Sequence, residues 1–288
     1  MVIAVLADIH ANLQALDAVI ADARAQGATE FVVAGDYVIG GPSPVEVLDR
    51  LAELTPHVIR GNHEEYLLDR RAGKGPGWEH HHQTASMQWT YERIGSTQWA
   101  YIEGLPAHLS LKFEGVSVLV VHGSPWHSRG RLVPGENDDD IQCAARETAE
   151  DALICAHTHL PWSGHVQGKL FLNPGSVGIH FDTADGAAKY ALLHIEEGCV
   201  RAQPCSVAYD RDALWRDIRG SGLLDYAPHW TMLSFVGNID GRNYCFEFLQ
   251  DAWSERRRRG LPEEGFLPND VWEDVWERWV QRLPQLRF

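Results

Sequence analysis

The chain has 288 residues and a mass of 32.3 kDa, which is enough for one large domain or for a domain with an appendage. Hydrophobic residues make up 44% of the sequence and charged residues 23%, so wholesale disorder and fibrous repeats are excluded. With 25 Lys and Arg against 40 Asp and Glu, the net charge of −15 repels polyanions, and binding a long nucleic acid would need a local basic patch or metal ions.

Short apolar segments alternate with amphipathic ones over the first two-thirds of the chain. The apolar segments predict strands at residues 2–7, 31–34, 57–60, 116–121, 152–156, 169–172 and 189–194. One helix is predicted from Leu13 to Ala23, where apolar residues recur at i+3 and i+4 steps, and two more over residues 84–94 and 139–150. Strands this apolar are covered on both faces, so we expect an α/β or α+β fold with packed layers.

The pattern changes past about Gly222, where strand signals weaken and tryptophan becomes frequent. A stripe with helical spacing predicts a helix that Asn269 caps, and its members are Trp272, Val275, Trp276, Trp279 and Leu283. We interpret residues 223–288 as a helical extension of a domain at residues 1–222, packed on that domain or at a dimer contact. The alternative is a lid that reaches the active site. The basic run from Arg256 to Arg259 is interpreted as a solvated helix end, with a phosphate contact as the alternative.

The termini and the cysteines favour a cytoplasmic protein without membrane segments. The N-terminal sequence MVIAVLADIH has no basic region and reaches Asp8 too soon for a signal peptide. No run approaches 18 consecutive apolar residues, the length that a membrane-spanning helix needs. The 5 cysteines are odd in number and form no CxxC pair, which is typical of reduced thiols rather than of a disulfide framework.

Polar side chains follow five of the predicted strands at the point where each strand ends. These residues are Asp8, His10, Asp36, Asn62, His63, His122, His157 and His159. Loops at the carboxyl ends of strands in an open sheet converge on one crevice. The sequence therefore predicts that these side chains meet at one edge.

Imidazole, carboxylate and amide groups without a thiolate suit divalent ions such as Mn²⁺, Fe²⁺, Zn²⁺ or Co²⁺. If the strand pleat continues, Asp8 and His10 point the same way, because residues two apart share a face. The same holds for His157 and His159, although a turn there would send the two rings to different ions. Asp36 is a candidate to bridge two cations at about 3.5–4 Å, the separation in two-metal hydrolytic sites.

Each of these residues also has a simpler interpretation. A single histidine such as His122 is more often a core or surface residue than a ligand. Asp8 or Asn62 would serve equally as a helix N-cap. Because all the candidates follow apolar strands, we favour a metal site over a set of unrelated structural roles.

The ordered motifs resemble those of the calcineurin-like metallophosphoesterases over about residues 1 to 210. They are Asp8-x-His10, Gly35-Asp36, Gly61-Asn62-His63-Glu64, His122-Gly123 and Ala156-His157-Thr158-His159. The segments Gly35 to Pro42 and Asn173 to Gly178, with Tyr209-Asp210, are similar to the small bacterial branch of YfcE-like phosphodiesterases and diadenosine tetraphosphate hydrolases. Ala11 and Ala156 depart from the family pattern, which has glycine at both positions. The tryptophan-rich tail has no counterpart in it.

The resemblance implies a four-layer α/β/β/α sandwich and a dinuclear metal centre. It implies that one ion is held by Asp8, His10, Asp36 and His159, and the other by Asp36, Asn62, His122 and His157. We expect two divalent ions, Mn²⁺ first and Fe, Zn, Ni or Co as alternatives. The implied catalytic residues are Asp36, Asn62 and His63, with His63 off the metals beside the leaving-group oxygen.

The expected function is hydrolysis of a small phosphodiester or of a nucleotide phosphoanhydride, with a metal-activated hydroxide attacking phosphorus. The first alternative is a phosphomonoesterase or protein phosphatase, and the second is a binding scaffold that kept the fold but lost catalysis. The expected partner is a small phosphate ester or nucleotide, with no membrane and no long nucleic acid. The tail leaves a homo-oligomer open.

Other residues near the motifs have weaker assignments. Asn12 either orders the first loop or touches substrate, and Arg60 is expected to be structural. The run His80-His81-His82, beyond the Gly/Pro-rich segment 73–77, is expected in a mobile surface loop, with a cap over the metals as the alternative. Ser124 and His127 are candidates to line the pocket, and Gly175-Ser176 is expected to form a tight turn. Cys155 is expected in a buried strand, which leaves a cysteine nucleophile without support.

Overall fold

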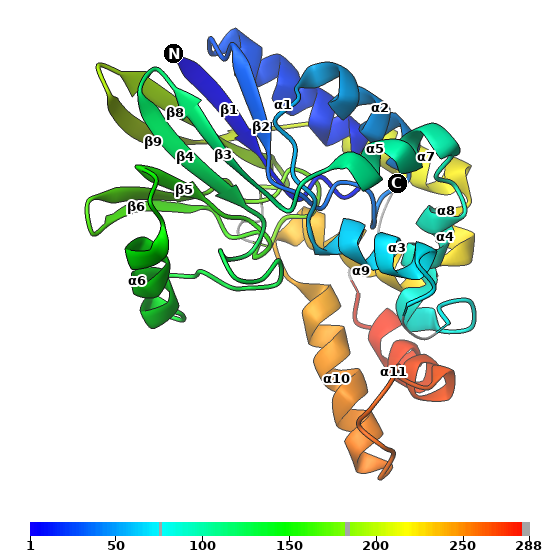
Figure 1. Cartoon of the computed structure of the whole chain (residues 1–288). Coiled ribbons are helices and arrows are strands. Elements are labelled where there is room, and N and C mark those ends of the chain that lie inside the picture. Colours follow the sequence, from blue (N-terminus) through cyan, green and yellow to red (C-terminus); the bar gives the residue numbers. More distant parts are fainter. Residues whose placement is uncertain (75–76, 182–184, 284–288) are drawn as a thin grey trace.

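A computed structural model describes residues 1–74, 77–181 and 185–283, and places two β-sheets face to face between helices (Figure 1). The first sheet has four strands in the order β2-β1-β8-β9. Their bounds are β1 (Val2–Leu6), β2 (Glu30–Val33), β8 (Ala188–Glu196) and β9 (Cys199–Val207). Only β1 and β2 run parallel, so this sheet is mixed.

The second sheet has five strands in the order β3-β4-β5-β7-β6 and is also mixed. Its strands are β3 (His108–Phe113), β4 (Val116–Val121), β5 (Ala152–Ile154), β6 (Trp162–Val166) and β7 (Lys169–Asn173). The three central strands, β4, β5 and β7, run parallel, while β3 and β6 close the two edges antiparallel. The carboxyl ends of β4 and β5 therefore meet at one edge.

Alternation along the strands separates two cores. In β1, Ile3 and Val5 join the layer between the sheets, whereas Ala4 and Leu6 face the helices. Those helices are α1 (Leu13–Ala25), α2 (Pro44–Leu54), α3 (Asn62–Arg71), α4 (Ala85–Tyr91) and α5 (Ser96–Gly104). On the far side of the second sheet, Phe171 packs against α6 (Asp138–Glu147). The layers are thus α/β/β/α, and the expected fold is confirmed.

Five helices follow the sheets. They are α7 (Arg211–Ser221), α8 (Leu223–Tyr226), α9 (Pro228–Asp240), α10 (Tyr244–Arg258) and α11 (Asn269–Val280). The last three, α9 to α11, share a core of their own, while α7 and α8 pack against α1 and α4. The predicted tryptophan stripe faces inward, with Trp272 and Trp279 packed around Phe248 of α10. Figure 1 shows α10 and α11 side by side, extending away from the sheets. The division into domains at residue 222 stays a prediction.

The strand predictions succeed in the sheet interiors and at the edge strand β2, and fail at the other three edges. The expected strand at 57–60 is wrong: in this segment Val58 makes only an isolated bridge to Val33. Strands β3, β6 and β9 were not predicted, and all three lie at sheet edges. Their residues alternate between exposed and half-buried positions, so they lack the continuous apolar run that marks a central strand.

Two expectations for the tail need correction. Asn269 does not cap α11, which begins at Asn269 itself after Pro268. Its side chain instead accepts from the backbone N–H of His82 at 3.0 Å and donates to the carbonyl of His80 at 2.6 Å. The run Arg256 to Arg259 is a solvated helix end only in part: Arg257 and Arg258 are exposed, whereas Arg256 is buried and donates to the carbonyls of Pro262, Glu264 and Gly265. None of the helices among the described residues is both long and apolar enough to span a bilayer.

Substituting Trp272, whose side chain is fully buried, by alanine should lower the free energy of unfolding by about 3–5 kcal/mol, because the cavity left behind removes apolar contacts with Phe248. Denaturant unfolding measures the change. Val280→Ala on the same helix is the matched control, since Val280 is 48% exposed and should change stability by less than about 0.5 kcal/mol. Equal effects of the two substitutions would contradict this packing.

Candidate metal centre

The loops that follow the strands bring the eight predicted site residues to one edge of the sandwich. Asp8 and His10 follow β1, Asp36 follows β2, and Asn62 and His63 begin α3. His122 follows β4, while His157 and His159 follow β5. Six of the eight are buried, and His63 and His157 are half-buried at the entrance. The side chains thus meet at one edge, as the rule for the carboxyl ends of strands predicts.

Left-handed backbone, rather than a continued pleat, turns these side chains toward one another. The predicted ligands with positive φ are Asp8 (52°), His10 (49°), Asp36 (55°), His157 (67°) and His159 (60°). The expectation that Asp8 and His10 converge by sharing a strand face is wrong, since β1 ends at Leu6. Non-glycine residues rarely adopt this conformation, and such strain is concentrated at functional sites.

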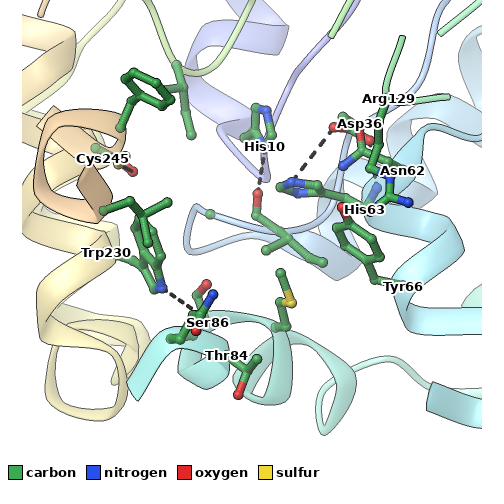
Figure 2. A pocket seen from close by; sticks show the side chains of 18 of the residues that line it. His10, Asp36, Asn62, His63, Tyr66, Thr84, Ser86, Arg129, Trp230 and Cys245 are labelled. Carbon is green, nitrogen blue, oxygen red and sulfur yellow. Dashed lines mark hydrogen bonds and ion pairs between the residues drawn. The ribbon is translucent and has the colours of Figure 1, made fainter. Parts of the chain in front are cut away.

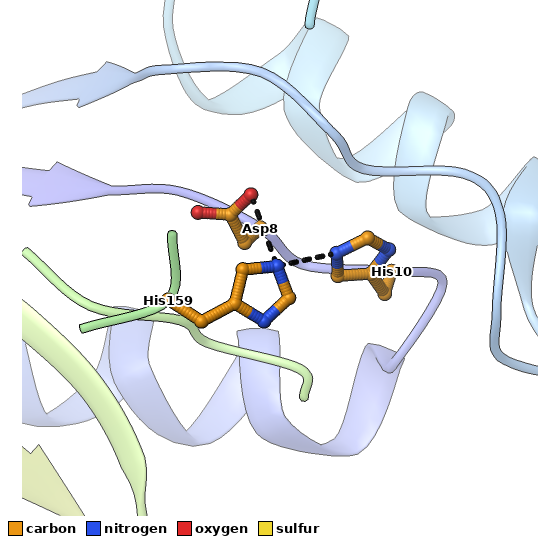
Figure 3. Close-up of side chains that lie close together, drawn as sticks. All are labelled: Asp8, His10 and His159. Atoms are coloured by element: carbon orange, nitrogen blue, oxygen red, sulfur yellow. Dashed lines mark hydrogen bonds and ion pairs between the residues drawn. The ribbon is translucent and has the colours of Figure 1, made fainter. Parts of the chain in front are cut away.

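The first cluster joins Asp8, His10 and His159 (Figure 3). The Nε2 atoms of His10 and His159 lie 3.1 Å apart, and His159 Nε2 lies 3.4 Å from Asp8 Oδ1. The other nitrogens of both rings face carbonyls: His10 Nδ1 lies 2.7 Å from the oxygen of Ile39, and His159 Nδ1 lies 2.7 Å from that of Ile179.

The second cluster joins Asp36, His122 and His157, with Asn62 beside them. His122 Nε2 lies 3.1 Å from Asp36 Oδ2 and 3.1 Å from Asn62 Oδ1. The Nδ1 atom of His122 lies 2.6 Å from the carbonyl oxygen of Ala34. His157 and His159 thus belong to different clusters, as the alternative with a turn predicted.

The hydrogen bonds of the ring nitrogens leave electron pairs facing one another. A carbonyl only accepts, so Nδ1 of His10, His122 and His159 must carry the proton, and each neutral ring then holds a lone pair on Nε2. In the first cluster, two such lone pairs meet at 3.1 Å. Asp8 Oδ1 is buried beside them and accepts no hydrogen bond from the described residues. Divalent cations fit this donor set, because metal-binding histidines commonly donate their second N–H to a carbonyl.

Without a cation, protons must bind between the lone pairs and carboxylates to reduce their repulsion. Burial disfavours a charged His122, but the Asp36 and Asp8 carboxylates outweigh it and raise the pKa of His122 to about 10. Burial, followed by His63, lowers the pKa of His10 to about 3. Burial would raise the pKa of Asp36, yet His122 and His63 hold it well below the usual value. A cation at these atoms would take the place of the proton on His122.

Asp8 also lies between the clusters, with its Oδ1 3.9 Å from His122 Nε2. Asp36 groups with the second cluster. Its Oδ1 accepts from the backbone N–H of His63 at 2.8 Å, which leaves Oδ2 toward His122. That Asp36 bridges two ions stays a prediction.

Glu64 supports the site, although no separate role was predicted for it. Its fully buried carboxylate accepts from the backbone N–H groups of Asp36, Tyr37 and Gly61 at 2.8–3.0 Å. These bonds tie the loop after β2 to the start of α3. Gly61 makes the close approach possible, because a Cβ there would lie 2.2 Å from Asp36 Oδ1.

The clusters open into a cavity of about 730 Å³. Figure 2 shows His10, Asp36, Asn62 and His63 on one side and Trp230 opposite them. The opposite wall is largely apolar and comes partly from the C-terminal helices; it includes Trp78, Met87, Trp230, Phe246, Leu249 and Phe266. The C-terminal segment therefore packs on the first domain, through α7 against α1 and α8 against α4, and also reaches the cavity. A lid function for it stays a prediction.

Arg129 and Tyr66 also line the cavity and were not predicted. The Arg129 guanidinium carbon lies 6.0 Å from the centre of the Tyr66 ring, beside His63 in Figure 2. Arg129 lies on the loop after β4, so the rule that found His122 could have found it too.

Other residues near the motifs have structural roles. Asn12 caps α1 and donates to the carbonyl of Gly178, and Arg60 donates to that of Leu105. Ser176 donates to the carbonyl of Asp8, as expected of a tight turn. Ser124 and His127 bond each other's backbone instead of lining the cavity that the described residues form. Burial raises the pKa of the Cys155 thiol to about 12, as expected of an inert cysteine.

The His80-His81-His82 run faces the C-terminal helices rather than the metal clusters. His81 contacts Phe266, and His82 pairs with Glu273 at 2.8 Å. The expected surface loop is therefore packed against α11 on one side. Within the Gly/Pro-rich segment 73–77, residues 75 and 76 lie outside the described residues.

Comparison with known proteins agrees with the motifs. Residues 1–198 match the family model of the calcineurin-like phosphoesterase superfamily domain, which covers more than half of the chain. The chain belongs to this superfamily, and the predicted resemblance is confirmed. Assignment to the YfcE-like branch stays a prediction.

Relatives of similar length share the fold. The uncharacterized protein MJ0912 of Methanocaldococcus jannaschii is 26% identical over 245 residues, which cover 79% of this chain and 94% of that protein. A metallophosphoesterase from Sphaerobacter thermophilus superposes with a TM-score of 0.65 at 24% identity, covering 80% of this chain and 98% of that one. The hypothetical protein PH1004 from Pyrococcus horikoshii OT3 gives 0.69 at 22% identity, covering 83% and 98%.

Cation binding should release protons. His122, with a pKa of about 10 without metal, is protonated at pH 8, so a cation at its Nε2 displaces about one proton. As pH rises toward 10 the proton competes less, and the apparent association constant should increase by about tenfold per pH unit. Calorimetric titration of the metal-free protein in two buffers of different ionisation enthalpy measures the release. Surface His165→Gln should leave it unchanged, whereas cation uptake without proton release would contradict the assignment.

Proposed function

We propose that this phosphoesterase hydrolyses small phosphodiesters, or the phosphoanhydrides of nucleotides, with two divalent cations. The observation that carries the proposal is the convergence of imidazole lone pairs and buried carboxylates at the floor of a large cavity. Such a floor attracts cations, and the cavity above it has room for an organic phosphate ester.

Each cluster supplies the ligands for one ion. Asp8, His10 and His159 would hold the first ion, and Asn62, His122 and His157 the second. Asp36 would contribute to both. Two bound divalent cations polarise the phosphoryl oxygens and make water nucleophilic at neutral pH. Nitrogen and oxygen ligands without sulfur favour Mn²⁺, with Fe, Zn, Ni or Co as alternatives.

His63 is placed to hold a proton for the leaving group. Its Nε2 lies 3.8 Å from Asp36 Oδ2, its ring centre lies 4.9 Å from that of His10, and its side chain lines the cavity. From there it can donate to the departing alkoxide oxygen. Burial lowers the pKa of His63, and the Asp36 carboxylate beside it opposes that shift without outweighing it, so the proton has to be supplied when the anionic substrate binds.

The cavity favours a diester over a monoester. A diester carries two organic groups, which the apolar wall around Trp230 and Phe266 can accept. Near the clusters, Arg129 supplies a cation for a phosphate oxygen, and Lys74 is the other basic residue of the described lining. The net charge of −15 argues against long nucleic acids as substrates.

Two alternatives remain to be compared with this proposal. A phosphomonoesterase or protein phosphatase would use the same clusters, so only substrate preference separates it from a diesterase. A binding scaffold is less well supported, because all the histidines expected for catalysis lie in the clusters or at their entrance.

The function is tested with purified protein loaded with Mn²⁺ and offered bis-p-nitrophenyl phosphate, p-nitrophenyl phosphate, cyclic nucleotides and dinucleoside polyphosphates. We expect a higher kcat/KM for diesters than for monoesters. Asp36→Asn should reduce kcat by at least about 10³-fold and release both ions, because its charge serves both clusters. Preference for monoesters would favour the first alternative, and no turnover by folded, metal-loaded protein would favour the scaffold. Stoichiometric metal retained by Asp36→Asn would contradict the bridging role.

His63→Ala should retain both ions and lose kcat by about 10²–10⁴-fold for alkyl esters, whose leaving groups need a proton. The loss should be much smaller for p-nitrophenyl esters, because p-nitrophenolate leaves unprotonated. Comparing kcat for the two classes, with metal content measured in parallel, checks the role. Equal losses on both ester classes would rule out proton donation by His63.

A further inference from the structure

A third group of metal-binding side chains lies outside the phosphoesterase clusters. His82 of the 3₁₀ helix η1 (His82–Thr84), His229 of α9 and Glu273 of α11 each offer one ligand atom, and these atoms lie within 4.8 Å of one another. Glu273 Oε1 lies 2.8 Å from His82 Nε2 and 3.6 Å from His229 Nε2. The three elements are far apart in sequence and meet only in the fold.

These separations suit ligands of a single ion. Ligand atoms around a tetrahedral cation with bonds of about 2.0–2.1 Å are roughly 3.3 Å apart. The contact between His229 Nε2 and Glu273 Oε1, at 3.6 Å, is about 0.3 Å longer than this and too long for a hydrogen bond. The pair His82 and Glu273 would need to open by only about 0.5 Å. The corresponding distances in the phosphoesterase clusters, at 3.1–3.4 Å, fall between the lengths of these two contacts.

The surroundings of His229 keep its ring neutral and available. Its side chain is buried, with ring centres 6.0 Å from that of Trp272 and 4.7 Å from that of Trp276. A charged imidazole would be costly in this aromatic setting, whereas the neutral ring is the form that binds a metal.

We propose that His82, His229 and Glu273 bind a third divalent cation, of the Zn²⁺ class, with water completing the coordination. Two imidazoles and one carboxylate are a ligand set that zinc adopts in proteins. His82 and Glu273 are only partly buried, so an ion can enter from solvent. This site does not depend on the proposed phosphoesterase activity, because it shares none of its ligands.

The ion would join the three elements that support the far wall of the cavity. The carbonyl of Gln83, next to His82, accepts from Trp230 Nε1 at 2.8 Å, and the Gln83 side chain accepts from the backbone of Leu267 at 2.9 Å. Trp230 follows His229 directly, and Gln83 and Trp230 both line the cavity. The third cation is therefore a structural clamp behind the apolar wall.

Metal counting tests the proposal. The intact chain, stripped with chelator and dialysed against excess Zn²⁺, is analysed for bound zinc per chain by mass spectrometry. Glu273→Gln and His82→Ala should each bind one ion fewer than the wild-type chain. The controls Glu277→Gln, on the same helix, and His80→Ala, in the same loop, should match the wild type, since both side chains are exposed. Equal zinc content in Glu273→Gln, His82→Ala and wild type would overturn the proposal.

The zinc-dependent change in Tm is a second test, designed to exclude the contribution of the two catalytic ions. In the Asp36→Asn background, Zn²⁺ at about 100 times its Kd should raise Tm by about 5 °C, and adding Glu273→Gln should abolish that rise. If Glu273 only forms an ion pair, the variant lowers Tm equally with and without zinc, which overturns the site. Substitutions are made at the partly exposed residues His82 and Glu273, because replacing the buried His229 would itself disturb folding. If the protein proves to have no phosphodiesterase activity, the expected differences in zinc content and in the zinc-dependent Tm shift stay the same.

Discussion

The arrangement of the site rests on one electrostatic constraint. Lone pairs of histidine nitrogens and carboxylate oxygens face one another in a buried space, with few N–H or O–H groups to bond them. Carbonyl groups hold the Nδ1 protons of His10, His122 and His159, so the Nε2 lone pairs point toward carboxylates and toward one another. Only a positive charge between them makes this arrangement stable, either as a proton or as a metal ion. The pKa of about 10 for His122 is the effect of the same constraint when no metal is bound.

The sandwich holds these groups in place against their mutual repulsion. Five of the candidate ligands lie on left-handed turns, each of which costs of order 1–3 kcal/mol for a non-glycine residue. The strands that precede those turns are packed on both faces, and the Glu64 carboxylate ties two of the loops together through backbone N–H groups. The apolar layers thus supply the rigidity that the polar edge requires.

The sequence predictions were most accurate for the apolar layers and least accurate for the turns at the polar edge. Central strands such as β1 and β4 were predictable because two covered faces demand a continuous apolar run. The edge strand β9 carries no such signal, since one of its faces meets water. Residue types and the carboxyl-end rule were enough to gather the metal-ligand candidates. They did not reveal the left-handed turn at Asp8, because φ is set by contacts with other loops.

Long-range pairing explains the remaining differences. Asn269 resembles an N-cap locally, but its amide bonds the backbone of residues 80 and 82, which lie about 190 positions earlier in the chain. Arg256 resembles part of a solvated basic run, but it is buried against carbonyls of the segment that follows α10. Periodicity and composition describe neighbours along the chain and do not encode such partners.

The cavity takes its floor from one stretch of the polypeptide and much of its far wall from another. The floor comes from loops within residues 1–198, the part that matches the superfamily, whereas α9 and α10 supply Trp230, Phe246 and Leu249 to the wall. Selectivity for the organic portion of a ligand can therefore diverge among relatives through changes in the C-terminal helices. For protein engineering, substitutions on the cavity side of α9 and α10 are a route to changing what the cavity accepts.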